Sequence, residues 1–337
     1  MSKVAIVNSS DILPVLKTIG WLIPKGSSSV PVGVHIVGRR VSFVVDGSVS
    51  YVAHVPCIES TPLSVTVLFQ PVEDFIPSND SVVLTSNSQG LELATTDFSI
   101  TFEMAYSVVD YTDLIEATKW REFENVESAI YGLRTLVSSG LAAFYKKDRP
   151  IQIYGDVSCL SYMNVVVQTR TIGLPFAASM SMEMCKLFIK FKPDSYNLAD
   201  GWLKLRAGSS ALALPCKSNT GENDVPSYIA VMSGPVTLDA GKYYDKICAI
   251  AKMKYQRLSI SLYTDGMVTR ADGKNATLRV PLGNPSGAPV VSFIVPTDLW
   301  SICTKLLKSK RFQMLYDKEG LICLRTAEEI ILLRALR

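Results

Sequence analysis

The sequence lacks the features by which most enzymes and membrane proteins are recognised. No apolar run approaches the roughly 18 residues that a membrane-spanning helix needs. The motifs GxxxxGK[ST], GxGxxG and GxSxG are absent, so nothing indicates a P-loop, a dinucleotide-binding turn or a hydrolase nucleophile. No cluster of carboxylates stands out. We therefore expect no catalytic residues and no cofactor, although an unrecognised enzyme is not excluded by sequence alone.

Histidine and cysteine are also poorly suited to chemistry. His35 and His54 are the only histidines, and both fall in predicted strands, where structural or surface roles are expected. The 7 cysteines are odd in number and include no CxxC pair, which favours buried, reduced thiols over disulfides or a metal site. The first residues, MSKVAIVNSSD, contain no secretory apolar segment, so a cytoplasmic location is expected.

What the sequence does contain is a repeat. Val290–Lys308 begins as a β-branched strand and continues, after Pro296, as a helix with apolar residues at helical spacing. Similar strand-then-helix joints occur at Leu63–Ser78 and Ala177–Lys192, and their starts lie 114 residues apart (177 − 63). Three copies predict three repeated domains, at 1–110, 111–232 and 233–337.

Each domain is predicted to have an α+β fold built from two half-units. Each half-unit has the order strand, helix, strand, strand, strand. Besides the joints, a short helix is predicted around 72–76, long helices at 126–139 and 242–254, and a strand at 228–232. Units of this kind cannot cover both edges of their sheets, so neighbouring units are expected to share sheets.

Charge is distributed unevenly along the chain, although the net charge is only +3. Residues 1–110 hold 5 Lys+Arg and 10 Asp+Glu, which gives −5. Residues 111–232 hold 13 and 12, which gives +1, and residues 233–337 hold 16 and 9, which gives +7. An acidic first third and a basic last third could be complementary between two chains, or the basic third could contact an anionic partner.

Many basic residues lie on the polar sides of predicted helices or just beyond the helix ends. An ordinary solvated surface explains any one of them, but their recurrence in three units favours contact with phosphates, without reading of base sequence. The predicted DNA-binding residues are Lys17, Arg134, Lys146, Lys147, Lys186, Lys190, Lys242, Lys246, Lys252, Lys305 and Lys308.

With these features the chain resembles the sliding clamps, the rings that make DNA polymerases processive, and looks like a divergent member of bacterial or phage type. The resemblance rests on the threefold repeat and on the half-unit order. It also rests on FIVPTDLWSICTKLL at Phe293–Leu307, on the TDG turn at Thr264–Gly266 and on the final LLRALR at Leu332–Arg337.

The resemblance implies a clamp fold in which helices line a ring and sheets form its outside. It implies a head-to-tail homodimer that encircles double-stranded DNA, has no catalysis or cofactor, and binds a DNA polymerase and a clamp loader through short linear motifs. In the bacterial family the partner pocket lies between the second and third domains. Carried over to this sequence, its residues are Val165, Thr171, Leu174, Ile331, Leu333 and Leu336.

Two other functions remain open at this point. A monomeric clamp-like polymerase subunit could hold DNA on a basic face without forming a ring. A β-rich structural or virion assembly protein would instead form large assemblies and would have no use for lysines at matching helix positions. The mass in solution discriminates between these alternatives.

Overall fold

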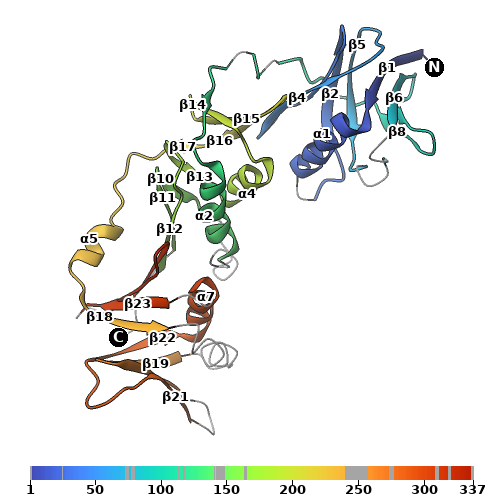
Figure 1. Ribbon diagram of the computed structural model, residues 1–337. Coiled ribbons are helices and arrows are strands. Elements are labelled where there is room, and N and C mark those ends of the chain that lie inside the picture. Colours follow the sequence, from blue (N-terminus) through green and yellow to red (C-terminus); the bar gives the residue numbers. More distant parts are fainter. Residues whose placement is uncertain are drawn as a thin grey trace. The chain divides into compact units, whose positions relative to one another are not determined.

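The structure, a computed structural model shown in Figure 1, describes residues 2–24, 26–72, 76, 80–112, 114–116, 118–139, 141, 149–162, 165–239, 257–272, 277–307, 311–317 and 320–334. The chain divides into two compact units. Unit 1 comprises residues 1–124 and 190–217, and unit 2 comprises residues 125–189 and 218–337. Because strands from neighbouring repeats share sheets, these units cut across the three expected domains, whose boundaries stay a prediction.

Unit 1 contains two antiparallel sheets and the helix α1 (Ser9–Leu22). The smaller sheet has the order β1-β6-β7-β8, and the larger has the order β5-β2-β3-β4-β16-β15-β14-β9. The strands are β1 (Ser2–Asn8), β2 (Val30–Val37), β3 (Arg40–Val45), β4 (Ser50–Pro56), β5 (Leu63–Phe69), β6 (Ser81–Ser86), β7 (Gly90–Ala94), β8 (Ser99–Glu103), β9 (Arg121–Glu122), β14 (Ser195–Ala199), β15 (Trp202–Ala207) and β16 (Ser210–Pro215).

Unit 2 also contains two antiparallel sheets, of orders β17-β13-β10-β11-β12-β25-β24-β23-β18 and β21-β20-β19-β22. Its helices are α2 (Val126–Ser138), α5 (Val225–Ala230) and α7 (Thr297–Leu307), and α4 (Met182–Phe191) spans the boundary between the units. The strands are β10 (Ile151–Tyr154), β11 (Val157–Tyr162), β12 (Val165–Arg170), β13 (Ala177–Met180), β17 (Lys217–Ser218), β18 (Ser233–Asp239), β19 (Arg257–Tyr263), β20 (Gly266–Asp272), β21 (Thr277–Gly283), β22 (Val291–Pro296), β23 (Arg311–Tyr316), β24 (Leu321–Arg325) and β25 (Glu329–Arg334).

The predicted half-unit recurs along the whole chain, and its halves are interlocked. The first strand of each half-unit pairs with a strand of the other half of the same domain. These pairs are β1 with β6, β5 with β2, β9 with β14, β13 with β10, β18 with β23 and β22 with β19. No half-unit can therefore complete its sheet alone.

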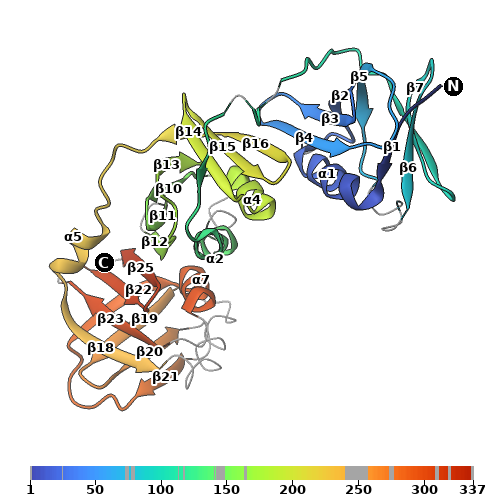
Figure 2. The ribbon, with the colours of Figure 1, turned by 45° about the horizontal axis from the view of Figure 1, so that its top comes forward.

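The helices cover one face of the large sheets with apolar side chains. In unit 1, α1 buries Ile12, Leu16 and Ile19 and lies beside β4 (Figure 2). Beneath it the fully buried Tyr51 donates a hydrogen bond to Ser210 Oγ at 3.4 Å, and burial raises the Tyr51 pKa to about 12. Burial disfavours the charged phenolate, so this side chain behaves as part of the apolar core.

The strand-then-helix joints expected at 177–192 and 290–308 are confirmed as β13 with α4 and β22 with α7. The helices expected around 72–76 and at 242–254 fall on or against segments outside the described residues. The strand expected at 228–232 is wrong, because α5 spans Val225–Ala230 and has proline at its start, where the missing amide hydrogen costs nothing. The short β9 and β14 were not expected.

Candidate nucleic-acid interface and partner surface

The four helices of ten or more residues that the structure describes share one arrangement of charge. Each carries an acid in its first turn, namely Asp11, Glu127, Glu183 and Asp298. Each also carries a base at its ninth residue, counted from the first helical residue, namely Lys17, Arg134, Lys190 and Lys305. The helix dipole favours acids first and bases later in any exposed helix. The recurrence of one position in four helices is the feature that this effect does not explain.

In unit 1 two of these bases belong to one surface. Lys17 is exposed, on the side of α1 opposite to the buried Leu16 and Ile19. Trp21 follows it by four residues and so lies on the same side of the helix. Lys190 of α4 places its Nζ 5.3 Å from the centroid of the Trp21 ring, within the range of a cation–π contact. This surface therefore presents two lysines held around one indole ring.

In unit 2 the structure describes two exposed predicted bases, Arg134 on α2 and Lys186 on α4. Helix α2 is positioned firmly: Asn125 caps it by accepting a hydrogen bond from the Ser128 amide at 3.2 Å. At Gly132 an added Cβ would lie 2.1 Å from the Arg170 carbonyl oxygen of β12. The helix backbone thus rests directly on the sheet, which leaves Arg134 facing solvent.

The other predicted DNA-binding residues are less fully described. Lys305 lies within α7, whose apolar face buries Leu299, Trp300 and Leu306, but its side chain is outside the description. Lys146, Lys147, Lys242, Lys246, Lys252 and Lys308 lie outside the described residues. The DNA interface as a whole stays a prediction.

The predicted partner-pocket residues of unit 2 are buried at a sheet seam. Strand β12 pairs with β25, with Val165 opposite Leu333 and Val167 opposite Ile331. Val165, Thr171, Leu174, Ile331 and Leu333 are each at most 1% exposed, and Leu336 is outside the described residues. Thr171 donates to the Gly155 carbonyl oxygen at 3.1 Å, so its hydroxyl serves the interior. Whether these residues contribute to a partner pocket stays a prediction.

The opposite face of the same seam carries an apolar cluster that the sequence analysis missed. We call it the outer cluster of unit 2. Its buried members are Cys159, Val225, Cys323 and Leu332, with Tyr154, Val166, Ile229, Met232, Leu315, Leu321 and Ile330 partly buried against it. Side chains alternate between the faces of a strand, so the neighbours of the predicted residues, Val166 and Ile330, are those that reach this face.

A polar clasp holds the start of α5 on the outer cluster of unit 2. Asn223 donates to Gln168 Oε1 of β12 at 3.0 Å and accepts from the Val225 amide at 3.2 Å. The buried Cys159 donates to the same Gln168 oxygen at 3.5 Å, and burial raises the Cys159 pKa to about 12. This thiol therefore stays protonated near neutral pH and acts as a structural group.

The histidines make contacts of a structural kind. His35 Nδ1 lies 2.9 Å from Ser64 Oγ, and His54 Nδ1 lies 2.9 Å from Ser42 Oγ. Burial lowers the pKa of His35. Among the described residues, no group of three or more His, Cys, Asp or Glu side chains could hold a metal ion. In the same part of the chain, no helix has the length and apolar character needed to span a membrane.

Two sheet edges stay open although their equivalents are paired. The last strands of four half-units pair with one another, β4 with β16 and β12 with β25. The corresponding strands of the other two, β8 and β21, are end strands of the four-stranded sheets, and no described strand covers their outer sides. Figure 1 shows β21 at such a sheet end. The chain thus has two seams of one kind and two halves of a further one.

The ladder pattern identifies the backbone groups on the open side of β8. Met104 donates its amide to the Gln89 carbonyl oxygen, and the Thr95 amide donates to Phe98. Since antiparallel ladders exchange hydrogen bonds at every second pair, Ile100 and Phe102 point their amides toward β7. The alternate residues Ser99, Thr101 and Glu103 therefore point their backbone groups outward.

The same reasoning applies to β21. The Asn284 amide donates to the Asp265 carbonyl oxygen, so residues 278, 280 and 282 face β20. Residues 277, 279, 281 and 283 face outward. One of them is Pro281, whose missing amide hydrogen thus falls on the open side, where a strand tolerates proline. Exposed Glu103 on β8 and exposed Arg279 on β21 give the two edges opposite charges.

No protein-family model and no curated protein matches the sequence. Solved structures, in contrast, match the chain over its length. The DNA polymerase III subunit beta of Pseudomonas aeruginosa has a TM-score of 0.74 at 11% identity, over 99% of both chains. The DNA polymerase sliding clamp of Caulobacter crescentus has 0.76 at 10% identity, over 100% of both chains. The Helicobacter pylori beta clamp bound to a DNA ligase peptide has 0.70 at 9% identity, over 100% of both chains.

The chain therefore has the sliding-clamp fold, which confirms the expected α+β fold class. At these identities the comparisons establish the fold, and the function is argued from the site.

Proposed function

We propose that the protein is a sliding clamp: a head-to-tail homodimer that encircles double-stranded DNA and tethers a DNA polymerase without catalysis of its own. The observation that carries the proposal is the pair of open edges, β8 and β21. Joining β8 of one chain to β21 of another repeats the antiparallel seams β4–β16 and β12–β25. With three domains to a chain, two chains are expected to close the ring.

Contact with DNA is assigned to the repeated bases on the helices. Lys17, Arg134, Lys186 and Lys190 are exposed and come from three helices, which suits contact with phosphates at many angles. Such contacts are weak singly and release counterions, so binding should depend steeply on salt. No base-reading element is needed for a protein that acts at every sequence on DNA in the cytoplasm.

Partner binding is assigned to the β12–β25 seam of unit 2. The Helicobacter pylori clamp of the same fold was solved with a DNA ligase peptide bound, which supports recognition of short linear motifs. The outer cluster of unit 2 offers half-buried apolar side chains for such a motif, including Ile229 and Met232. A polymerase and a clamp loader are the expected partners, and the loader would supply the ATP hydrolysis.

The mass in solution and the topology of DNA binding test the proposal together. Light scattering should give a mass near twice 36.9 kDa. The chain is then diluted until the dimer dissociates, mixed with nicked circular DNA and concentrated, so that rings close around the circle. We expect retention on the circle at a salt concentration that removes the protein from linear DNA with free ends.

Other outcomes identify the alternatives. A monomer that leaves circular and linear DNA at the same salt concentration would be an open DNA-holding subunit. Large assemblies with no retention on either DNA would indicate a structural protein. Either result would refute the ring.

A further inference from the structure

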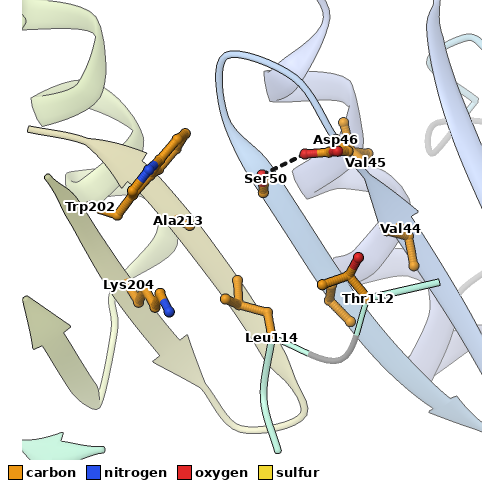
Figure 3. A pocket seen from close by; sticks show the side chains of 10 residues that line it. Val44, Val45, Asp46, Ser50, Thr112, Leu114, Trp202, Lys204 and Ala213 are labelled. Atoms are coloured by element: carbon orange, nitrogen blue, oxygen red, sulfur yellow. Dashed lines mark hydrogen bonds between the residues drawn. The ribbon is translucent and has the colours of Figure 1, made fainter. Parts of the chain in front are cut away.

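An apolar pocket with a volume of about 260 Å³ lies within unit 1, at the seam where β4 pairs with β16 (Figure 3). Strands β3, β4, β15 and β16 supply its base, and the segment that precedes β9 crosses it. The lining residues are Val44, Val45, Asp46, Ser50, Val52, Thr112, Leu114, Trp202, Lys204 and Ala213. All of them belong to unit 1, so the site is complete within one compact body.

The pocket exists because small side chains line this seam. On the outer face of β16, Ala211 pairs with Val52 and Ala213 pairs with Ser50. At the corresponding seam of unit 2, β25 instead carries Ile330 and Leu332, and Val225 of α5 packs over them. Alanine side chains fill much less volume than isoleucine or leucine, so the space that unit 2 closes with its own residues is left open in unit 1.

The pocket has the composition of a site for an anchoring side chain. Trp202 is only partly buried against the apolar cluster of this seam, so part of its indole ring is available for contact. A volume of about 260 Å³ is below the roughly 300–1,000 Å³ of pockets that enclose whole ligands, and it suits one or two side chains. Partly exposed aromatic rings in such pockets are frequent anchors of protein–protein contacts.

The charged groups at the pocket indicate which side chain accompanies the anchor. Asp46 is already engaged, since it accepts a hydrogen bond from Ser50 Oγ at 2.8 Å (Figure 3). Lys204, which lies opposite Ala213 in the β15–β16 ladder, makes no ion pair with any described residue. A half-buried ammonium beside an apolar pocket is complementary to a carboxylate.

We propose that this pocket is a second partner site, which takes a short peptide segment of a partner protein with a bulky apolar residue next to an acidic one. The apolar side chain enters between Leu114 and Trp202, and the carboxylate faces Lys204. This goes beyond the proposed function, because tethering a polymerase requires only the surface of unit 2. A second site would let the protein hold two partners at once.

The test uses two blocked tripeptides, acetyl-Asp-Leu-Phe-amide and acetyl-Lys-Leu-Phe-amide, titrated to millimolar concentration against the full chain. The readout is the indole amide signal of Trp202 in a nitrogen-15 spectrum, assigned with Trp202→Phe. The acidic peptide should shift this signal and bind more tightly than the basic one. Lys204→Glu should invert the preference, with a change of roughly three- to tenfold for each peptide.

Two controls keep the proposal falsifiable. Lys217→Glu changes an exposed lysine of unit 1 outside the pocket and should leave both affinities unchanged. Ala213→Leu, checked by thermal melting for an intact fold, should fill the pocket and abolish the shift. Failure of both peptides to move the Trp202 signal, or equal binding to the wild type and Lys204→Glu, would overturn the proposal.

A further outcome identifies another occupant. If Lys204→Glu or Ala213→Leu changed the mass measured by light scattering, the pocket would belong to a contact between copies of this chain, which also overturns the proposal. We expect both variants to keep the dimer mass and the retention on circular DNA. The partner site can thus fail while the ring proposal stands, and the reverse also holds.

Discussion

Proline substitutions in β8 test ring closure with a change of one residue in position. Thr101 points its amide to the open side of the sheet, whereas Ile100 points its amide toward β7. In Thr101→Pro the chain keeps every hydrogen bond inside its sheet but loses a donor to the partner strand. The same arrangement already occurs at Pro281 of β21, so a proline with an outward nitrogen is compatible with these edges.

The expected effect follows from hydrogen-bond energies. Each seam loses one bond, worth about 1 kcal/mol, and leaves one carbonyl of the partner strand unpaired at a further cost of about 1–3 kcal/mol. A two-chain ring contains this seam twice, so the dimer should lose roughly 4–8 kcal/mol. That corresponds to a dissociation constant raised by about 10³-fold or more.

Sedimentation over a dilution series measures the dissociation constant, and urea unfolding measures the stability of the chain. Thr101→Pro should be a monomer with nearly unchanged unfolding. Ile100→Pro, the matched control, should instead lower the free energy of unfolding by about 3 kcal/mol, because its lost bond lies inside the sheet. A Thr101→Pro variant that dimerises like the wild type would refute the assignment of β8 as the closing edge.

Three further predictions concern single positions. Lys17→Ala and Arg134→Ala should each flatten the dependence of log affinity for DNA on log salt by roughly 0.9, and an unchanged slope would remove that residue from the interface. Gly132→Ala should lower the free energy of unfolding in urea by roughly 1–3 kcal/mol, because its Cβ would meet the Arg170 carbonyl at 2.1 Å; wild-type stability would contradict this packing. The Tyr51 pKa rises from 10.0 to about 12 on folding, so its stabilisation is complete below pH 10 and lost toward pH 12; Tyr51→Phe should reduce this alkaline loss in urea titrations, and an identical pH profile would argue against burial of the phenol.

Local sequence patterns predicted the repeated elements well, because the elements depend on local periodicity. The joint at Val291–Leu307 is an example: β-branched residues form β22, Pro296 ends it, and apolar residues at helical spacing form α7. The strand expected at 228–232 failed because the apolar residues near α5 suit either period over so short a stretch. Pro226, just inside the helix start, was the available signal.

The sites were less accessible to sequence, because they depend on pairings between distant strands. The candidate partner residues Val165, Ile331 and Leu333 are one residue away from those that reach the outer cluster of unit 2, and a shift of one residue changes the face of a strand. The pocket of unit 1 needs β4 beside β16, which no local pattern announces. The ninth-residue bases, in contrast, could have been found by aligning the helix starts.

The seam between β4 and β16 has a consequence for synthesis of the chain. Ala53 pairs with Ser210, 157 residues later (210 − 53), so the edge of β4 has no partner until that much more chain has been made. At roughly 5–20 residues per second this takes about 8–31 s. During that time an apolar strand edge, containing Tyr51 and Val52, faces the cell interior. Such edges are prone to intermolecular pairing, so the nascent chain is a natural client for chaperones until β16 emerges.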